Sequence, residues 1–109
     1  MTFARACGTN DVASGSALAV KVEDVDVAIM RDGDDWYAVA DECSHAAIPL
    51  SEGDVEGCEI ECWLHGSRFD LRTGKPTGPP ATEPVPIYPV RVEADDVLVD
   101  VANPLNGGT

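Results

Sequence analysis

The apolar residues of this chain recur mainly with period two, and this alternation limits the possible folds more than any other feature. It runs through the stretches ALAVKVE, DVAIMR, WYAVAD, CEIEC, YPVRVE and DVLVDV. Such alternation places apolar side chains on one face of a β-strand. No window of about a dozen residues has sustained helical periodicity, and no internal repeat is present. The sequence therefore predicts an all-β fold.

Two hairpins are expected as the scaffold. The residues RDGDD, with Gly33 at their centre, predict a turn between strands at 25–31 and 36–40. The residues ADD predict a second turn, between strands at 87–93 and 97–101. Both hairpins lie outside the cysteine-rich part of the chain.

Two other segments are expected to lack strands. The segment 74–86 contains five prolines, and proline cannot donate the backbone hydrogen bonds of an interior strand. We expect an ordered loop of extended backbone there. The last residues, 102–109, are expected to form a flexible tail.

Size and charge narrow the classes of function. A chain of 109 residues with 44% hydrophobic content supports one core, so we expect a single domain over 1–109. The N-terminus lacks the apolar region of a signal peptide, and no apolar run is long enough to span a membrane. We therefore expect a cytoplasmic protein. The net charge of -13 argues against nucleic acid or an anionic membrane as a partner.

The segment 41–70 contains both histidines and three of the four cysteines of the chain. Cys43 and His45 form a C-x-H motif, and after the 16 residues 46–61 Cys62 and His65 form C-x-x-H. Two loops that each offer one thiolate and one imidazole can close a four-ligand site. This donor set suits tetrahedral zinc or iron bound to sulfide.

The spacing favours iron. The C-x-H spacing is tighter than the pairs of a zinc finger, and each half offers one cysteine and one histidine. In a 2Fe-2S cluster the two cysteines can bind one iron and the two histidines the other. A zinc-stabilised interaction module stays open as an alternative.

The residues CSH and CWLHGSRFD, followed by TGKPTGPPATEPVPIYPVRVE, resemble the Rieske-type [2Fe-2S] ferredoxins that serve ring-hydroxylating dioxygenases. The resemblance extends over most of the chain. It implies a small Rieske fold of stacked antiparallel sheets, with two cluster-binding loops and a proline-rich loop beside them. It also implies one 2Fe-2S cluster per chain.

The resemblance assigns roles to individual residues. The implied metal ligands are Cys43, His45, Cys62 and His65. The residues implied beside the cluster are Trp63, Leu64, Gly66, Ser67, Pro79 and Pro80. High-potential relatives carry a further cysteine in each cluster loop, where this chain has Ile48 and Leu64. Since that disulfide is missing, we expect an intermediate-to-low reduction potential, although a hydroxyl donor at Ser67 would raise it.

Cys7 and Cys58 are left over from the motif. Alternation in CEIEC predicts Cys58 on the same face as Ile60, as a buried small apolar residue. Cys7 lies in an expected first strand and is predicted to be buried as well. A disulfide between the two stays open, but no sequence feature requires it.

By resemblance, the chain is expected to carry single electrons from a flavoprotein reductase to a terminal aromatic-ring dioxygenase. It is expected to be a monomer, to bind its partners transiently and to catalyse no reaction itself. Two related roles stay open, in iron-sulfur assembly and in nitrite reductase. The sequence alone identifies neither the electron donor nor the acceptor.

Overall fold

The computed structural model describes residues 3–41, 49–61, 68–77, 84–102 and 105. Within them, short strands alternate with turns, and the helical residues form two 3₁₀ turns. The first elements are β1 (Ala4–Gly8), η1 (Thr9–Asp11), β2 (Ser16–Val22), β3 (Val25–Asp32) and β4 (Asp35–Ala40). There follow η2 (Leu50–Glu52), β5 (Asp54–Glu56), β6 (Glu59–Glu61), β7 (Arg68–Asp70), β8 (Ile87–Tyr88), β9 (Val90–Glu93) and β10 (Asp96–Val99).

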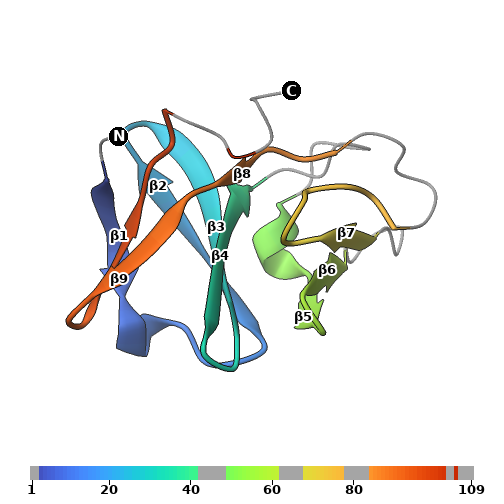
Figure 1. Ribbon diagram of the computed structural model, residues 1–109, viewed down its shortest axis with the longest axis horizontal. Coiled ribbons are helices and arrows are strands. Elements are labelled where there is room, and N and C mark those ends of the chain that lie inside the picture. The colour runs from blue at the N-terminus through green and yellow to red at the C-terminus, as the bar shows by residue number, and fades with distance from the viewer. Residues whose placement is uncertain (1–2, 42–48, 62–67, 78–83, 103–104, 106–109) are drawn as a thin grey trace.

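The described strands form three antiparallel sheets. One has the order β1-β10-β9, the central one β2-β3-β4-β8, and the third β5-β6-β7. Figure 1 shows the central sheet between the other two, with β5, β6 and β7 at the right. The predicted all-β fold of stacked antiparallel sheets is confirmed.

Both predicted hairpins are present. In the first, β3 pairs with β4 from Val27 and Ala40 to Asp32 and Asp35. Gly33 takes a φ of 63° in the connecting turn, a conformation that glycine adopts at low cost. In the second hairpin, β9 pairs with β10.

The predicted strand at 87–93 is wrong in its extent. It is divided at Pro89, which has no backbone N–H to donate. The first part, β8, pairs with β4 in the central sheet, whereas β9 pairs with β10 in a different sheet. The chain therefore passes from one layer to the next at this proline.

The central sheet is buried on both faces, which explains the apolar run in β3. Val27, Ala28, Ile29 and Met30 are all inaccessible to solvent. Val27 and Ile29 pack with the β1-β10-β9 sheet, and Ala28 and Met30 pack with the β5-β6-β7 sheet. The outer sheets are thus attached to opposite faces of one scaffold.

The small sheet at the end of the molecule is anchored by buried apolar side chains. Leu50 of η2, Ile60 of β6 and Phe69 of β7 are inaccessible to solvent and share one core with Ala28 and Met30. Burial of a side chain of this size contributes about 1.5–3 kcal/mol relative to exposure. This core fixes the sheet whose strands β6 and β7 precede and follow the second predicted cluster loop.

The proline-rich segment contains no strand in its described parts, 74–77 and 84–86, as predicted; Pro76 makes an isolated bridge to Phe69. Of the predicted tail the structure describes Ala102 and Leu105, whose amides donate to Asp100 and Ile87. The flexible tail and the single-domain organisation stay predictions. No helix among the described residues is long and apolar enough to cross a membrane.

Candidate metal centre

The predicted ligands, and the residues predicted beside the cluster, lie outside the described residues. These are Cys43, His45, Cys62, Trp63, Leu64, His65, Gly66, Ser67, Pro79 and Pro80. Their roles therefore stay predictions. The structure does describe the chain on both sides of the three segments that contain them, 42–48, 62–67 and 78–83.

The ends of the first segment are joined by a side-chain clamp. Oδ1 of Asp41 accepts a hydrogen bond from the backbone amide of Ser51 at 2.7 Å, and Oδ2 accepts one from the Ser51 hydroxyl at 2.8 Å. Asp41 lies two residues before Cys43. The clamp thus holds together the two ends of the segment that carries the first predicted ligand pair.

The second segment begins and ends at paired positions of neighbouring strands. Glu61, the last residue of β6, lies opposite Arg68, the first residue of β7. The Arg68 guanidinium forms ion pairs with Glu61 at 3.3 Å and with Glu59 at 3.6 Å. These pairs are partly exposed, so each contributes only about 0.2–1 kcal/mol. The backbone pairing of β6 with β7 therefore holds Glu61 beside Arg68 more strongly than the ion pairs do.

The described chain after the first segment approaches the last residue of β6 at Gly53. Asp54 pairs with Glu61 across β5 and β6, and Gly53 precedes that pair. A Cβ on Gly53 would overlap the carbonyl oxygen of Glu61, and it would lie 2.9 Å from the carbonyl carbon. Only glycine permits such an approach of two backbones. The segment after the first motif therefore lies against the residue that precedes Cys62.

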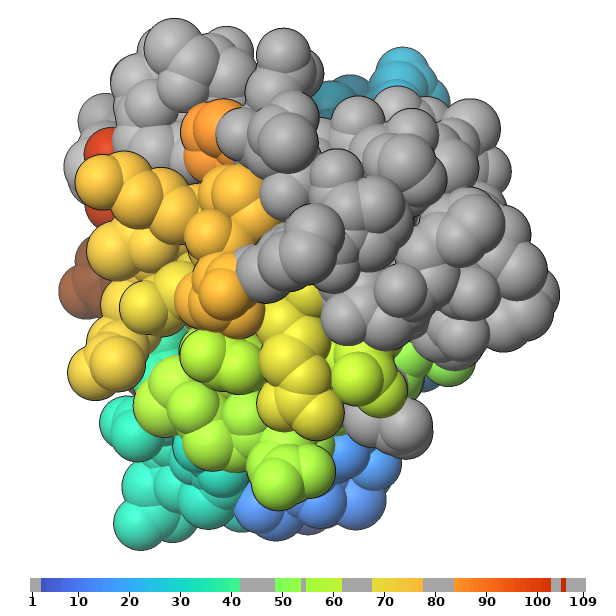
Figure 2. All heavy atoms as spheres, turned by 90° about the vertical axis from the view of Figure 1, so that its right-hand side faces the viewer, coloured from blue at the N-terminus to red at the C-terminus, as the bar shows by residue number. Residues whose placement is uncertain are grey.

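The beginning of the proline-rich segment is bonded to Arg68, the first residue of β7. The amide of Thr77 donates to the carbonyl of Arg68 at 2.8 Å, and the amide of Val85 donates to the carbonyl of Gly74 at 2.8 Å. These bonds fix the described chain just before 78 and just after 83. Figure 2 faces this end of the molecule, where the small sheet and the residues after β7 form the described green to orange surface.

The donor set of these segments fits a cluster with two unlike irons. The sequence supplies two thiols and two imidazoles in two matched pairs. Among the described residues beside these segments, Asp41 is bonded to Ser51, and Gly53 and Asp54 lie against Glu61. Thiolate and imidazole ligands of this number suit the two irons of a 2Fe-2S centre.

Cys58 does not lie where the alternation predicted. It occupies the turn between β5 and β6 with a φ of 65°, and it is only half-buried. Its thiol lies 3.3 Å from the hydroxyl of Tyr37 and donates to Asp32 at 3.4 Å. The hydrogen bond to Cys58, followed by burial, raises the pKa of Tyr37 to about 12. Cys58 therefore connects the small sheet to the first hairpin.

Cys7 is buried in β1, as predicted. Burial raises the pKa of its thiol, which makes it a weak nucleophile. Cys7 packs in the core beside the β1-β10-β9 sheet, whereas Cys58 lies in the turn between β5 and β6, and both are free thiols. The disulfide left open by the sequence is therefore absent.

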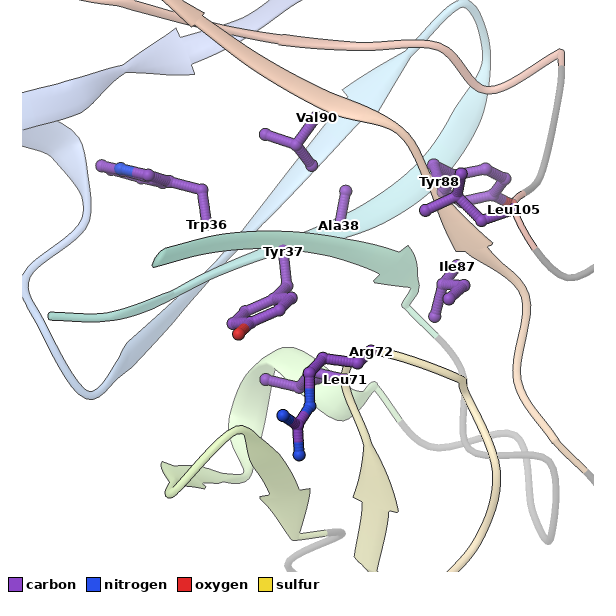
Figure 3. Close-up of a pocket in the computed structure, with 9 residues that line it drawn as sticks. All are labelled: Trp36, Tyr37, Ala38, Leu71, Arg72, Ile87, Tyr88, Val90 and Leu105. Carbon is purple, nitrogen blue, oxygen red and sulfur yellow. The ribbon is translucent and has the colours of Figure 1, made fainter. Parts of the chain in front are cut away.

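A pocket of about 300 Å³ lies at the edge of β4. Figure 3 shows Trp36, Ala38 and Val90 on one side of this strand and Tyr37 with Arg72 on the other. Its described lining is mainly apolar and aromatic. Nowhere among the described residues do three or more histidine, cysteine or acidic side chains form a group that could hold a metal. The described part of the chain therefore offers no competing metal site.

The model of the Rieske [2Fe-2S] domain family matches residues 2–89. The chain belongs to this family. A Rieske domain holds one 2Fe-2S cluster, so the predicted cofactor is confirmed at the level of the family. The match favours a 2Fe-2S cluster at the four predicted ligands over the single structural zinc that the zinc-stabilised module required.

Proteins similar to this Rieske domain include ferredoxins of dioxygenase systems. It is 44% identical to the biphenyl dioxygenase ferredoxin subunit of Pseudomonas sp. (strain KKS102), over 92% of this chain and 93% of the relative. Among solved structures, the ferredoxin of carbazole 1,9a-dioxygenase from Nocardioides aromaticivorans IC177 has a TM-score of 0.85 and 40% identity, over 91% of this chain and 97% of that one.

A third similarity is to a structure that contains a complex. It is described as reduced oxygenase and oxidized ferredoxin in carbazole 1,9a-dioxygenase, with a TM-score of 0.82 and 36% identity over 89% of this chain and 91% of that one. The resemblance to dioxygenase ferredoxins stated from the sequence is therefore confirmed.

Sequence reasoning missed the residues that hold the ends of the loops. Asp41, Ser51 and Gly53 carry no signal in a metal motif, since none of them is a cysteine or histidine. The position of Asp41 two residues before the first motif was the available indication. Their contribution became visible only from the hydrogen bonds and the backbone approach described above.

Proposed function

We propose that this Rieske domain is a one-electron carrier of an aromatic-ring dioxygenase system. The observation that carries the proposal is the 44% identity to a biphenyl dioxygenase ferredoxin subunit over nearly the full length of both chains. Relatives of this kind are ferredoxin subunits, which supports a role in electron transfer without catalysis by this chain.

The proposed ligands divide by chemistry. Cys43 and Cys62 would hold one iron, and His45 and His65 would hold the other. When bound, the cluster supplies reversible uptake of one electron. The residues proposed beside it are Trp63, Leu64, Gly66, Ser67, Pro79 and Pro80. Trp63 and Leu64 would limit water at the site, and the hydroxyl of Ser67 would donate to a sulfide.

The proposed partners are a flavoprotein reductase and a terminal oxygenase. The oxygenase is supported by the complex of ferredoxin and oxygenase described for the carbazole system. Electron carriers of this size bind through small, transient interfaces, which suits a monomer. The net charge of -13 disfavours nucleic acid and anionic membranes as partners. The proposed cytoplasmic location is consistent with the free thiols of Cys7 and Cys58.

The alternative roles in iron-sulfur assembly and nitrite reduction are less well supported. The relatives at 36–44% identity described above are components of dioxygenase systems. A dioxygenase role therefore explains both the cluster motif and the similarity along the rest of the chain.

A redox titration of the purified protein tests the proposal. We expect one electron per chain, taken up reversibly, with a midpoint between about -150 mV and about +200 mV, because the loop disulfide of high-potential relatives is missing. The titration is followed by visible absorption under anaerobic conditions. A protein that takes up no electron reversibly would contradict the proposed function, and a midpoint above about +200 mV would contradict the argument from Ile48 and Leu64.

A further inference from the structure

The clamp between Asp41 and Ser51 joins a residue before the segment that carries Cys43 and His45 to a residue after it. Both carboxylate oxygens are used, one on a backbone amide and one on a hydroxyl, at 2.7 and 2.8 Å. A carboxylate that accepts two short bonds forms a stronger contact than a neutral pair does. The contact is partly buried, which limits competition from water.

Each end of the clamp is itself fixed to the scaffold. The amide of Asp41 donates to the carbonyl of Asp26, a residue of β3 in the central sheet, at 3.1 Å. Ser51 lies in η2 beside Leu50, which is inaccessible to solvent in the core. The clamp therefore joins two rigid points, and it closes a loop whose ends are ten positions apart.

Closing a loop at its base removes conformational freedom from every residue inside it. Metal ligands bind tightly when their positions are restricted before the metal arrives, and neighbours that orient them affect metal affinity by 10-fold or more. We propose that Asp41 is a positioning residue for the cluster, acting through Ser51 on the segment that carries Cys43 and His45. The inference rests on the proposed metal centre.

The test measures the rate at which iron is released to an excess chelator from the loaded protein, at a temperature where far-UV circular dichroism shows the fold intact. Asp41→Ala removes both bonds, and we expect release at least about tenfold faster than in the wild type. Ser51→Ala removes the hydroxyl bond alone and should have a smaller effect. The double variant should release iron no faster than Asp41→Ala, because both changes break the same contact.

Two further variants separate positioning from general stability. In Asp41→Asn the amide can accept from the Ser51 amide and donate to its hydroxyl, so we expect most of the wild-type retention of iron. Asp11→Ala is the matched control, since Asp11 accepts a 2.8 Å bond from the backbone of Gly8 at the far side of the molecule. It should release iron at the wild-type rate.

The outcomes distinguish the inference from the proposed function. A wild-type protein that binds iron and loses it at the same rate as Asp41→Ala overturns the inference alone. Acceleration by Asp11→Ala equal to that of Asp41→Ala also overturns it, because the effect would then be general. A wild-type protein that binds no iron overturns the proposed metal centre and the inference with it.

Discussion

Cys62→Ser is expected to lower the iron content from about two atoms per chain to nearly none. A cysteine binds the iron of such a cluster as a thiolate, whereas the much less acidic hydroxyl of serine keeps its proton at neutral pH and binds iron poorly. The visible absorption should disappear with the iron. Iron and acid-labile sulfide assays on the purified variant give the measurement.

Cys58→Ser is the matched control for that experiment. Cys58 lies four residues before Cys62, in the turn that precedes β6, and its side chain contacts Tyr37 and Asp32. A serine keeps both hydrogen-bonding partners, so this variant should retain the iron of the wild type. Loss of iron in Cys58→Ser, together with its retention in Cys62→Ser, would show that the ligands have been assigned to the wrong cysteines.

Gly53→Ala is expected to lower the free energy of unfolding by about 3 kcal/mol, at the upper end of the cost of overpacking. The new methyl group would overlap the carbonyl oxygen of Glu61, and it would lie 3.3 Å from the carbonyl oxygen of Leu50. Both obstacles are backbone atoms, which cannot move aside as a flexible side chain can. Relief requires β6 to shift, and Glu61 directly precedes Cys62. Iron retention should therefore fall together with stability.

Gly57→Ala provides the comparison for this steric effect. Gly57 has a φ of 58°, and nothing lies within 4 Å of an added Cβ. Its cost is conformational only, about 1–2 kcal/mol for a non-glycine residue in the left-handed region. Denaturant unfolding followed by circular dichroism gives both values. A smaller loss for Gly53→Ala than for Gly57→Ala would contradict the close approach of Gly53 and Glu61.

The scaffold of this fold could be predicted from local sequence, because hairpins depend on residues close together in the chain. Alternation on both sides of Gly33 defined the β3–β4 hairpin, and the structure pairs those strands. The strand at 87–93 was predicted too long. The alternation continues through Pro89, and only the missing N–H indicates that the chain changes sheets there.

The position of Cys58 could not be predicted from alternation alone. The period-two pattern extends through CEIEC, but Gly57 and Cys58 both have positive φ and form a two-residue turn between Glu56 and Glu59. Turns of this kind favour Asn-Gly or Asp-Gly, so Gly-Cys gave no signal. As a result the thiol contacts Tyr37 and Asp32 of the first hairpin. These residues are more than 20 positions away in the sequence, so a local pattern cannot predict the contact.

The candidate site, like the fold, could be predicted only in part from the sequence. The ligand motif could be recognised from the sequence, since spacing and residue type define it. The residues that hold the loop ends could not, because the contact of Asp41 with Ser51 and the approach of Gly53 to Glu61 depend on the packing of separate segments. Ordinary polar and small residues acquire these roles only in the folded chain.

The most direct test of the central claim is a combined analysis of metal, sulfide and nitrogen coordination in the protein purified anaerobically. We predict a red-brown protein with about two iron atoms and two acid-labile sulfides per chain. In the reduced state, electron-nuclear double resonance should detect coupling to the nitrogens of two imidazoles, from His45 and His65. A colourless protein with one zinc, or an iron-sulfur cluster without nitrogen coupling, would contradict a Rieske electron carrier.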